Sequence, residues 1–352
     1  MFAPIIHELR SRQVPHFVIH TGQHYSPNMD AQFLSDLALP VPDYRLEGVS
    51  QKKTHGGQTA AMLEGIENVL LDRKPRVVLV GGDANTNLAG ALAARKLGIR
   101  VGHVEAGERS YDWRMPEEHN RRMIDHISDY LFITSAKARH QLEKESVQGV
   151  VVETGNPIVD ASQAHLEMAL ERFGRGNAER TAGVPYAILT THREENVDHK
   201  EHLRGILAGA ERVAKDLGLT VFFLAHPRTR KRMHEFGFEG WVRGLAGIQL
   251  RDGAGYLEFL ALLSGASLVL TDSGGVQQEA CIHRIPCVTL RENTEWTETL
   301  AIGANRLAGV SPDRIARCAF EATQTRVDWQ IPFGDGQAAR RIVDFAATKI
   351  AG

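Results

Sequence analysis

The stretch RVVLVGGDANTNLAGALAARKLGIRVGHVEAG, residues 76–107, indicates which fold to expect. Two short runs rich in β-branched residues, at 76–81 and 100–105, enclose an amphipathic segment that ends in Gly98. Helices often end just before a glycine. A strand, a helix and a second strand in this order are typical of a parallel βαβ unit. The stretch therefore predicts part of a parallel sheet covered by helices.

The same alternation continues through most of the 352 residues. Further strands are expected at 16–21, 130–135, 149–154, 186–191, 220–225, 267–272 and 286–291. The polar segment 175–185 separates two groups of strands, which predicts an α/β protein of two Rossmann-like, doubly wound parallel-sheet domains facing a central cleft. We expect the N-terminal domain at 1–170 and the C-terminal domain at 180–335, with a final helix at 336–350 packed on the first domain.

The composition is that of an ordinary globular protein, with 43% hydrophobic and 24% charged residues. A net charge of −2 gives no support for a nucleic-acid or membrane surface. No apolar run approaches the roughly 18 residues of a membrane-spanning helix. Residues 1–13 have the pattern of an amphipathic helix rather than of a signal peptide. Three cysteines form neither a metal motif nor an even disulfide framework, so we expect a reducing, cytoplasmic compartment.

Polar clusters follow five of the expected strands. Ligands of open parallel sheets bind beyond the carboxyl ends of the strands. The clusters are GGDANTN (81–87), HVEAGERSYDWRMPEEHNRR (103–122), THREEN (191–196), TDSGGVQQEA (271–280) and RENTEWTE (291–298). Charges that only solvate the surface would also fall within helices and at the opposite strand ends. The grouping therefore favours a binding or catalytic site.

Residues 116–122 admit three interpretations. Pro116 is suited to the first position of a helix, where the helix dipole favours Glu117 and Glu118. Arg121 and Arg122 follow at ion-pair spacing. By itself the pattern favours solvated charges at a helix start over catalytic carboxylates. Metal binding is the other alternative, but the sequence has neither HExxH nor a Cys/His cluster, so no dedicated transition-metal site is expected.

The C-terminal half offers candidates for binding a diphosphate. Ser273, Gly274 and Gly275 lie between a strand and a helix, where backbone N–H groups can approach a phosphate. The alternative is an ordinary βα turn. Glu279, one turn later, could accept hydrogen bonds from a ribose diol, or it could be an ordinary surface glutamate. Arg228 could bind a phosphate, or it could belong to a solvated helix face.

Two further residues stand at strand ends. Asp83 follows two glycines that would expose its carboxylate. A lone histidine is more often structural than catalytic, but at a cleft edge His192 would be cationic near pH 7 and balance a leaving phosphate.

The motifs GGDANTN, GHVEAGERS, RMPEEHNR, TGNPIVDA, TTHREEN, HPRT, TDSGGVQQEA and TLRENTEWTET, in this order, resemble the UDP-N-acetylglucosamine 2-epimerase family. They span most of the chain. The resemblance implies the GT-B fold and interconversion of UDP-N-acetylglucosamine and UDP-N-acetylmannosamine without nicotinamide. UDP is eliminated to give a 2-acetamidoglucal and is then re-added, which supplies precursors of cell-surface polysaccharides. A homodimer is also implied, with no cofactor and no metal.

The resemblance assigns roles residue by residue. The implied catalytic side chains are Asp83, Glu105, Glu117 and His192. The implied UDP-binding residues are Ser273, Gly274, Gly275 and Glu279, with Arg228 as a less direct match. Which carboxylate acts as base and which as acid is left open.

Two departures from the family pattern bear on function. Relatives begin with a strand and a GTRPE-like turn that supplies an arginine to the substrate diphosphate, and MFAPIIHEL matches the segment just after that turn. We expect a start placed too far downstream rather than loss of a central strand. RSYDWRMPEEHNR resembles epimerases of other UDP-2-acetamido sugars, including diacetamido-uronic acids, equally well. The alternatives are those substrates, a hydrolysing epimerase, a GT-B glycosyltransferase and an inactive sugar-nucleotide-binding remnant.

Overall fold

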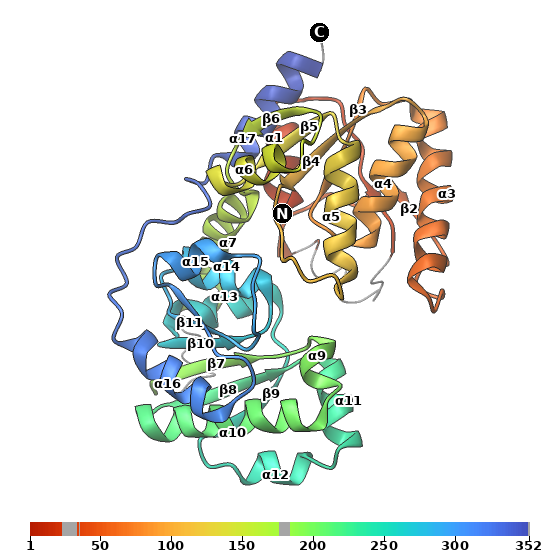
Figure 1. The fold of residues 1–352 in the computed structure, drawn as a ribbon. Helices are drawn as coiled ribbons and strands as arrows, with labels where there is room; N and C mark the ends of the chain where they lie inside the picture. The colour runs from red at the N-terminus through yellow and green to blue at the C-terminus, as the bar shows by residue number, and fades with distance from the viewer. Residues whose placement is uncertain (23–33, 35, 176–183, 351–352) are drawn as a thin grey trace. The chain divides into compact units, whose positions relative to one another are not determined.

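A computed structural model describes residues 1–22, 34, 36–175 and 184–350 of the chain. The chain divides into two compact units (Figure 1). The N-terminal unit comprises Met1–Ala161 and Phe333–Gly352, and the C-terminal unit comprises Ser162–Pro332. Most of the segment expected to link two domains, 175–185, lies outside the described residues.

The N-terminal unit contains a parallel sheet in the spatial order β3-β4-β5-β6. Its strands are β3 (Val77–Gly81), β4 (Arg100–Ala106), β5 (Tyr130–Ile133) and β6 (Val150–Glu153). A separate two-stranded parallel sheet pairs β1 (Ile19–His20) with β2 (Tyr44–Arg45). All of these except β2 coincide with strands predicted from the sequence, and β4 extends one residue beyond its predicted end at 105.

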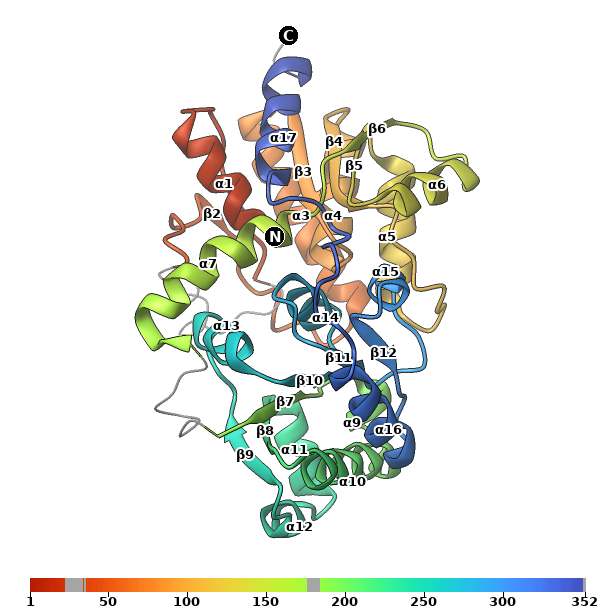
Figure 2. The same cartoon turned by 90° about the vertical axis from the view of Figure 1, so that its left-hand side faces the viewer.

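Helices cover both faces of the β3–β6 sheet. They are α1 (Phe2–Ser11), α3 (His55–Arg73), α4 (Asn85–Lys96), α5 (Pro116–Ile127), α6 (Ala136–Lys144) and α17 (Ala338–Phe345), which continues into the π-helical turn Ala346–Ile350. α1 and α17 lie side by side (Figure 1 and Figure 2), and Ile5 and Ile342 pack with Phe132 of the sheet. α3 and α4 pack together in a second core that includes Met62 and Val80.

The C-terminal unit is a doubly wound sheet of six parallel strands in the order β12-β11-β10-β7-β8-β9. Its strands are β7 (Tyr186–Thr190), β8 (Thr220–Ala225), β9 (Ile248–Asp252), β10 (Leu268–Thr271), β11 (Cys287–Thr289) and β12 (Asn305–Leu307). The chain proceeds outward from β7 in one direction and from β10 in the other. Ligands bind at such a reversal in open sheets, so the ends of β7 and β10 mark the expected site of this unit.

The described residues of the C-terminal unit form eight further helices. They are α9 (Glu194–Val197), α10 (Lys200–Leu217), α11 (Pro227–Glu235), α12 (Glu239–Gly244), α13 (Tyr256–Gly265), α14 (Gly274–Ile282), α15 (Thr297–Ala301) and α16 (Pro312–Thr323), while α7 (Pro157–Phe173) begins before the boundary of the units and ends beyond it. α10 is followed by Gly218, whose backbone is left-handed with φ of 64°, as is common after a helix. No helix in the described part of the chain is long and apolar enough to cross a membrane.

Candidate active site

Glu105 lies at a distortion near the end of β4. The pairing of β4 with β5 shifts register between Val104 and Ala106, and Glu105 has a left-handed backbone with φ of 73°. This conformation costs a non-glycine residue about 1–2 kcal/mol. Irregularities of this kind re-aim side chains next to active sites. The local backbone therefore gives the Glu105 side chain a direction that a regular strand would not.

The Glu105 carboxyl is largely withdrawn from water. Burial and, to a smaller extent, the negative charge of Asp83 raise its pKa to about 8. A hydrogen bond from Nδ2 of Asn156 to Oε2 of Glu105, 2.8 Å long, opposes this shift. At pH 7 the carboxyl is therefore mostly protonated, which is unusual for a glutamate.

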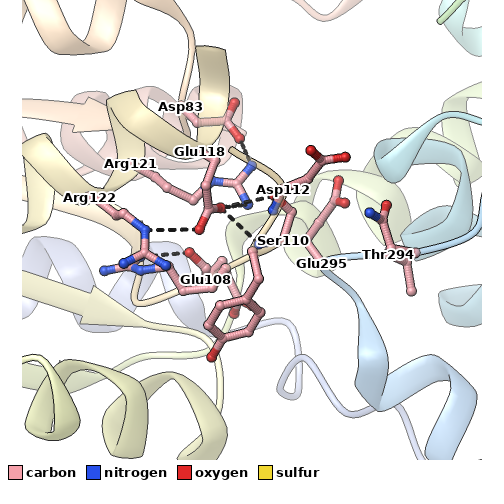
Figure 3. A network of polar contacts seen from close by, with 12 residues as sticks. Asp83, Glu108, Ser110, Asp112, Glu118, Arg121, Arg122, Thr294 and Glu295 are labelled. Atoms are coloured by element: carbon pink, nitrogen blue, oxygen red, sulfur yellow. Dashed lines mark hydrogen bonds and ion pairs between the residues drawn. The ribbon is translucent and has the colours of Figure 1, made fainter. Parts of the chain in front are cut away.

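Asp83 lies in the loop after β3 and is held from α5. Its carboxylate forms an ion pair with Arg121 (Figure 3). Nη1 of Arg121 also lies 3.4 Å from Oε2 of Glu118. Nδ2 of Asn120 donates a hydrogen bond of 2.8 Å to the Asp83 carbonyl. Gly82, with φ of 79°, provides the left-handed backbone that the turn requires.

α5 begins at Pro116, as predicted, but its charges are not the solvated ones that the sequence pattern favours. Glu118 is 0% exposed and accepts hydrogen bonds from the backbone N and Oγ of Ser110, at 2.8 and 3.0 Å. It also accepts a bond of 3.0 Å from Nε of Arg122 (Figure 3). The prediction of solvated charges is therefore wrong for Glu118 and for the buried Arg121. Glu117 is partly exposed in the first turn, and its catalytic role stays a prediction.

The network continues beyond Arg122 as alternating charges. Arg122 pairs with Glu145 at 3.0 Å, and Glu145 pairs with Arg109 at 2.7 Å. Arg109 pairs with Asp125 at 2.7 Å, and Asp125 lies 2.7 Å from Nδ1 of His103. Burial opposes ionisation of Asp125, but His103 and Arg109 outweigh it and lower the Asp125 pKa. The polar ends of β4 and α5 are thus joined by a continuous ionic chain.

In the C-terminal unit, Asp272 ties the end of β10 to the end of β7. The side chain is 0% exposed. It accepts hydrogen bonds from Oγ1 of Thr191 at 2.6 Å, the backbone N of His192 at 3.1 Å and the backbone N of Arg193 at 3.0 Å. Nδ2 of Asn196 donates a further bond of 3.0 Å. One carboxylate therefore fixes the loop that presents His192, at the point where the strand order reverses.

The charge of His192 depends on its burial and on the groups around it. Its Nδ1 lies 3.4 Å from Oδ1 of Asp272, and its ring centroid lies 5.4 Å from that of His226. Burial lowers the pKa of His192 below the ordinary 6.5, and the charge of Asp272 offsets this only in part. The imidazole is therefore mostly neutral at pH 7 in the absence of a ligand, and its role in balancing a leaving phosphate stays a prediction.

The start of α14 has the features of an anion site. Ser273 is the N-cap, and its Oγ accepts a hydrogen bond of 3.5 Å from the backbone N of Val276. A Cβ on Gly274 would lie 2.5 Å from Oε1 of Glu295, so this position has no room for a side chain. A Cβ on Gly275 would meet only Oγ of Ser273, at 4.0 Å. The second glycine thus leaves open space beside the positive end of the helix.

The last two predicted UDP-binding residues have defined partners. Glu279 is buried and hydrogen-bonded to Tyr256, and burial raises its pKa to about 7, so the surface alternative is wrong. Nη1 of Arg228 donates to Oε1 of Glu194 at 2.7 Å, and its Nη2 donates to Oδ2 of Asp198 at 2.5 Å. An anion at Arg228 would compete with these carboxylates.

Several residues of these networks were not singled out from the sequence. Asn156 and Asp272 stand within quoted motifs, and Asp272 also follows a predicted strand, so the strand-end rule provided a signal for it. His103 also stands within a quoted motif and Asp125 lies inside a helix, but the local pattern does not distinguish either of them. Throughout the described part of the chain, no three His, Cys, Asp or Glu side chains are arranged to hold a metal ion.

Comparisons with known proteins agree with the sequence motifs. Residues 7–347 match the family model described as UDP-N-acetylglucosamine 2-epimerase. The chain is 45% identical to a UDP-N-acetylglucosamine 2-epimerase of Methanococcus maripaludis, over 97% of this chain and 93% of that one. It is 38% identical to a UDP-2,3-diacetamido-2,3-dideoxy-D-glucuronate 2-epimerase of Pseudomonas aeruginosa, over 96% and 93%.

The fold agrees with solved structures as well. The Methanocaldococcus jannaschii UDP-GlcNAc 2-epimerase, crystallised with UDP-GlcNAc and UDP, matches with a TM-score of 0.91 and 44% identity. The match covers 98% of this chain and 95% of that one. The predicted α/β class, with two Rossmann-like parallel-sheet domains of the GT-B type, is confirmed.

Proposed function

Because the chain belongs to the UDP-N-acetylglucosamine 2-epimerase family, we propose that it interconverts UDP-N-acetylglucosamine and UDP-N-acetylmannosamine. The C2 proton passes to a base of the enzyme, and the bond between C1 and the diphosphate oxygen breaks. UDP and an enzyme-bound 2-acetamidoglucal result. UDP then re-adds at C1 while C2 takes a proton on the opposite face. The product supplies precursors of cell-surface polysaccharides.

The observation that carries the proposal is the pair of unlike carboxyl groups at the ends of β3 and β4. Glu105, with a pKa of about 8, holds a proton at pH 7, whereas Asp83 forms an ion pair with Arg121. Titratable groups whose environments differ in this way can divide acid and base roles. We assign proton donation at C2 to Glu105 and proton removal to Asp83, with Glu117 stabilising the oxocarbenium-like charge at C1.

The C-terminal unit is proposed to bind UDP. Its diphosphate would accept hydrogen bonds from the N–H groups of Gly274 and Gly275 at the start of α14. Ser273 would bind beside them, and Glu279 would accept a hydrogen bond from the ribose. His192 is neutral without ligand, and a nearby diphosphate would raise its pKa and favour the cation that balances departing UDP.

Arg228 is assigned a supporting role in binding the diphosphate. Its exposed partner Glu194 is the one that an anion would displace, because Asp198 is held in addition by Arg232 at 2.8 Å. Binding would thus exchange one surface ion pair for a phosphate contact, and exposed ion pairs of this kind contribute little stability.

The proposal is tested by incubating the protein with UDP-N-acetylglucosamine in D₂O and following the sugar by NMR. We expect the C2 hydrogen to be replaced by deuterium while the manno epimer appears. Glu105→Gln should abolish both, whereas Glu64→Gln, at an exposed position of α3, should retain them. Free UDP accumulating in equal amount with free sugar would show a hydrolysing enzyme instead. An absence of both exchange and turnover would refute the proposal.

A second candidate substrate is a UDP-2,3-diacetamido-2,3-dideoxy-glucuronate. It is favoured by the 38% identity to the Pseudomonas aeruginosa enzyme of that name and by the sequence RSYDWRMPEEHNR. Comparing kcat/KM for the two UDP-sugars distinguishes the candidates. A kcat/KM for the uronate more than about tenfold above that for UDP-N-acetylglucosamine corresponds to roughly 1.4 kcal/mol of transition-state stabilisation. In that case the uronate would be assigned as the substrate.

We further propose a cytoplasmic homodimer. The cytoplasmic location is supported by Cys281, Cys287 and Cys318, all of which are buried free thiols, as is usual in a reducing compartment. The dimer rests on the family resemblance alone. Cell fractionation tests the location, and light scattering coupled to gel filtration tests the dimer, which a monomer mass at micromolar concentration would exclude.

A further inference from the structure

His103 lies inside the N-terminal unit between two hydrogen-bond acceptors. It belongs to β4, two residues before Glu105, and is 0% exposed. Nδ1 of the ring lies 2.7 Å from Oδ1 of Asp125, and Nε2 lies 3.1 Å from the carbonyl oxygen of Gly82. A neutral imidazole has only one N–H. In a neutral His103, the ring nitrogen without a proton would therefore point its lone pair at the lone pair of an acceptor oxygen inside the protein.

Asp125 does not supply the missing proton. Its Oδ2 already accepts a hydrogen bond from the backbone N of Gly107 at 3.2 Å and pairs with Nη1 of Arg109 at 2.7 Å. A carboxyl group with these partners is ionised, because protonation would weaken the contact with a buried guanidinium. The carbonyl of Gly82 is an acceptor in every state. Both ring nitrogens of His103 therefore need a proton.

The ionic chain leads to the same charge state. It runs through Asp83, Arg121, Glu118, Arg122, Glu145, Arg109, Asp125 and His103. Four carboxylates in it face three guanidinium groups, so a neutral His103 would leave the chain one positive charge short. An uncompensated buried charge is costly. A cationic His103 balances the chain at its innermost end.

We propose that His103 is a permanently charged imidazolium that positions the two loops bearing Asp83 and Glu105. It holds the Gly82 carbonyl next to Asp83 directly. Through Asp125 it holds the amide of Gly107, two residues after Glu105. Its importance for turnover rests on the proposed function, whereas its charge state and its two contacts do not. His103 is a positioning residue because it acts through the loops that its contacts hold.

The charge state is tested on the unmodified protein labelled with ¹⁵N-histidine. Histidines with the ordinary pKa of about 6.5 are neutral at about pH 8.5, so each shows one nitrogen without a proton. We expect one signal among the 16 histidines to keep both nitrogens protonated at this pH. A spectrum in which every histidine is neutral would overturn the proposal. This outcome is independent of any activity, so it is distinct from failure of the proposed function.

Two substitutions separate the contacts of the ring. In His103→Asn the amide nitrogen takes the place of Nδ1 and keeps the contact with Asp125, whereas in His103→Gln it takes the place of Nε2 and keeps the contact with Gly82. Both remove the charge, and the imidazolium signal should vanish in each. It should also vanish in Asp125→Asn. His7→Gln is the matched control, because His7 is a partly buried histidine whose Nε2 contacts the carbonyl of Leu37 at 3.0 Å.

Loss of positioning should reduce kcat rather than substrate binding. We expect kcat to fall about 100-fold in both His103 variants, the usual effect of an ångström-scale misplacement, with KM little changed. His7→Gln should keep the wild-type kcat. Wild-type kcat in a folded His103→Asn or His103→Gln protein would refute the positioning role. If neither variant folds, the spectrum of the unmodified protein still decides the charge state on which the role depends.

Discussion

Replacing Glu105 with glutamine should stabilise the protein against unfolding at neutral and alkaline pH while strongly reducing turnover. The native pKa of about 8 lies above the ordinary value of 4.5 for a glutamate in an unfolded chain. Between these values the native state binds more protons than the unfolded state, so stability falls as pH rises. The penalty is absent below about pH 4.5, grows up to pH 8 and is constant above it. Glutamine has no such penalty because it does not ionise.

The size of the effect follows from the same two pKa values. Each pH unit between them is equivalent to about 1.4 kcal/mol. The free energy of unfolding of Glu105→Gln should therefore exceed that of the wild type by about 3 kcal/mol at pH 7, and by about 5 kcal/mol above pH 8. Near pH 4 the two proteins should be equal. Because Gln keeps an oxygen to accept the hydrogen bond from Asn156, the comparison isolates the charge.

The assay is urea-induced unfolding at pH 4.5, 7 and 9, with turnover measured on the same preparations. Loss of a group that transfers protons should reduce kcat by about 100- to 10,000-fold. The control Glu64→Gln removes one negative charge from an exposed position of α3 and should change stability by less than about 0.5 kcal/mol. Parallel stability curves for wild type and Glu105→Gln across this pH range would refute the reasoning.

Three further predictions concern the C-terminal unit. Asp272→Asn should destabilise the protein by about 3 kcal/mol, since buried donors lose a carboxylate acceptor; a loss below about 1 kcal/mol in urea would contradict this. Gly274→Ala should lower the free energy of unfolding by about 1–3 kcal/mol, because the new methyl group clashes with Glu295. Gly275→Ala should raise the free energy of unfolding by up to about 1 kcal/mol but weaken UDP binding, as measured by calorimetry. UDP affinity should rise between about pH 6 and 8 as Glu279, with a pKa of about 7, ionises; Glu279→Gln should lack this rise, and an unchanged pH profile would exclude the ribose contact.

The sequence was most informative where structure depends on local pattern. Runs of mostly apolar residues such as 220–225 became strands with the expected bounds, and Pro116 marked the start of α5. β2, with two residues, and β12, with three, are too short to show a period. β9 has the sequence IQLRD, whose polar residues alternate with apolar ones over only five positions. Such strands exist because a neighbouring strand pairs with them, which local sequence does not record.

The same limit applies to the candidate site. The rule that ligands bind at strand ends brought attention to Asp83, Glu105 and Ser273 without any knowledge of contacts. The burial of Glu118 was not predicted, because the first turn of a helix can have the same sequence whether its charged side chains face water or the protein interior. The imidazoles of His103 and His192 likewise lie close to carboxylates that are 22 and 80 residues away in the sequence. Spacing along the chain does not reveal which carboxylate will meet which imidazole.

The left-handed backbone of Glu105 also has an evolutionary consequence. At this position an L-residue pays a conformational cost that glycine avoids, so only selection for the carboxyl group keeps the unfavourable residue in place. In gene copies released from selection for turnover, glycine should replace Glu105 more often than alanine does, although one base change in a GAA or GAG codon reaches either. The residue at this position would then serve as a marker of catalytic decay. Equal rates of the two replacements among decaying copies would remove its value as a marker.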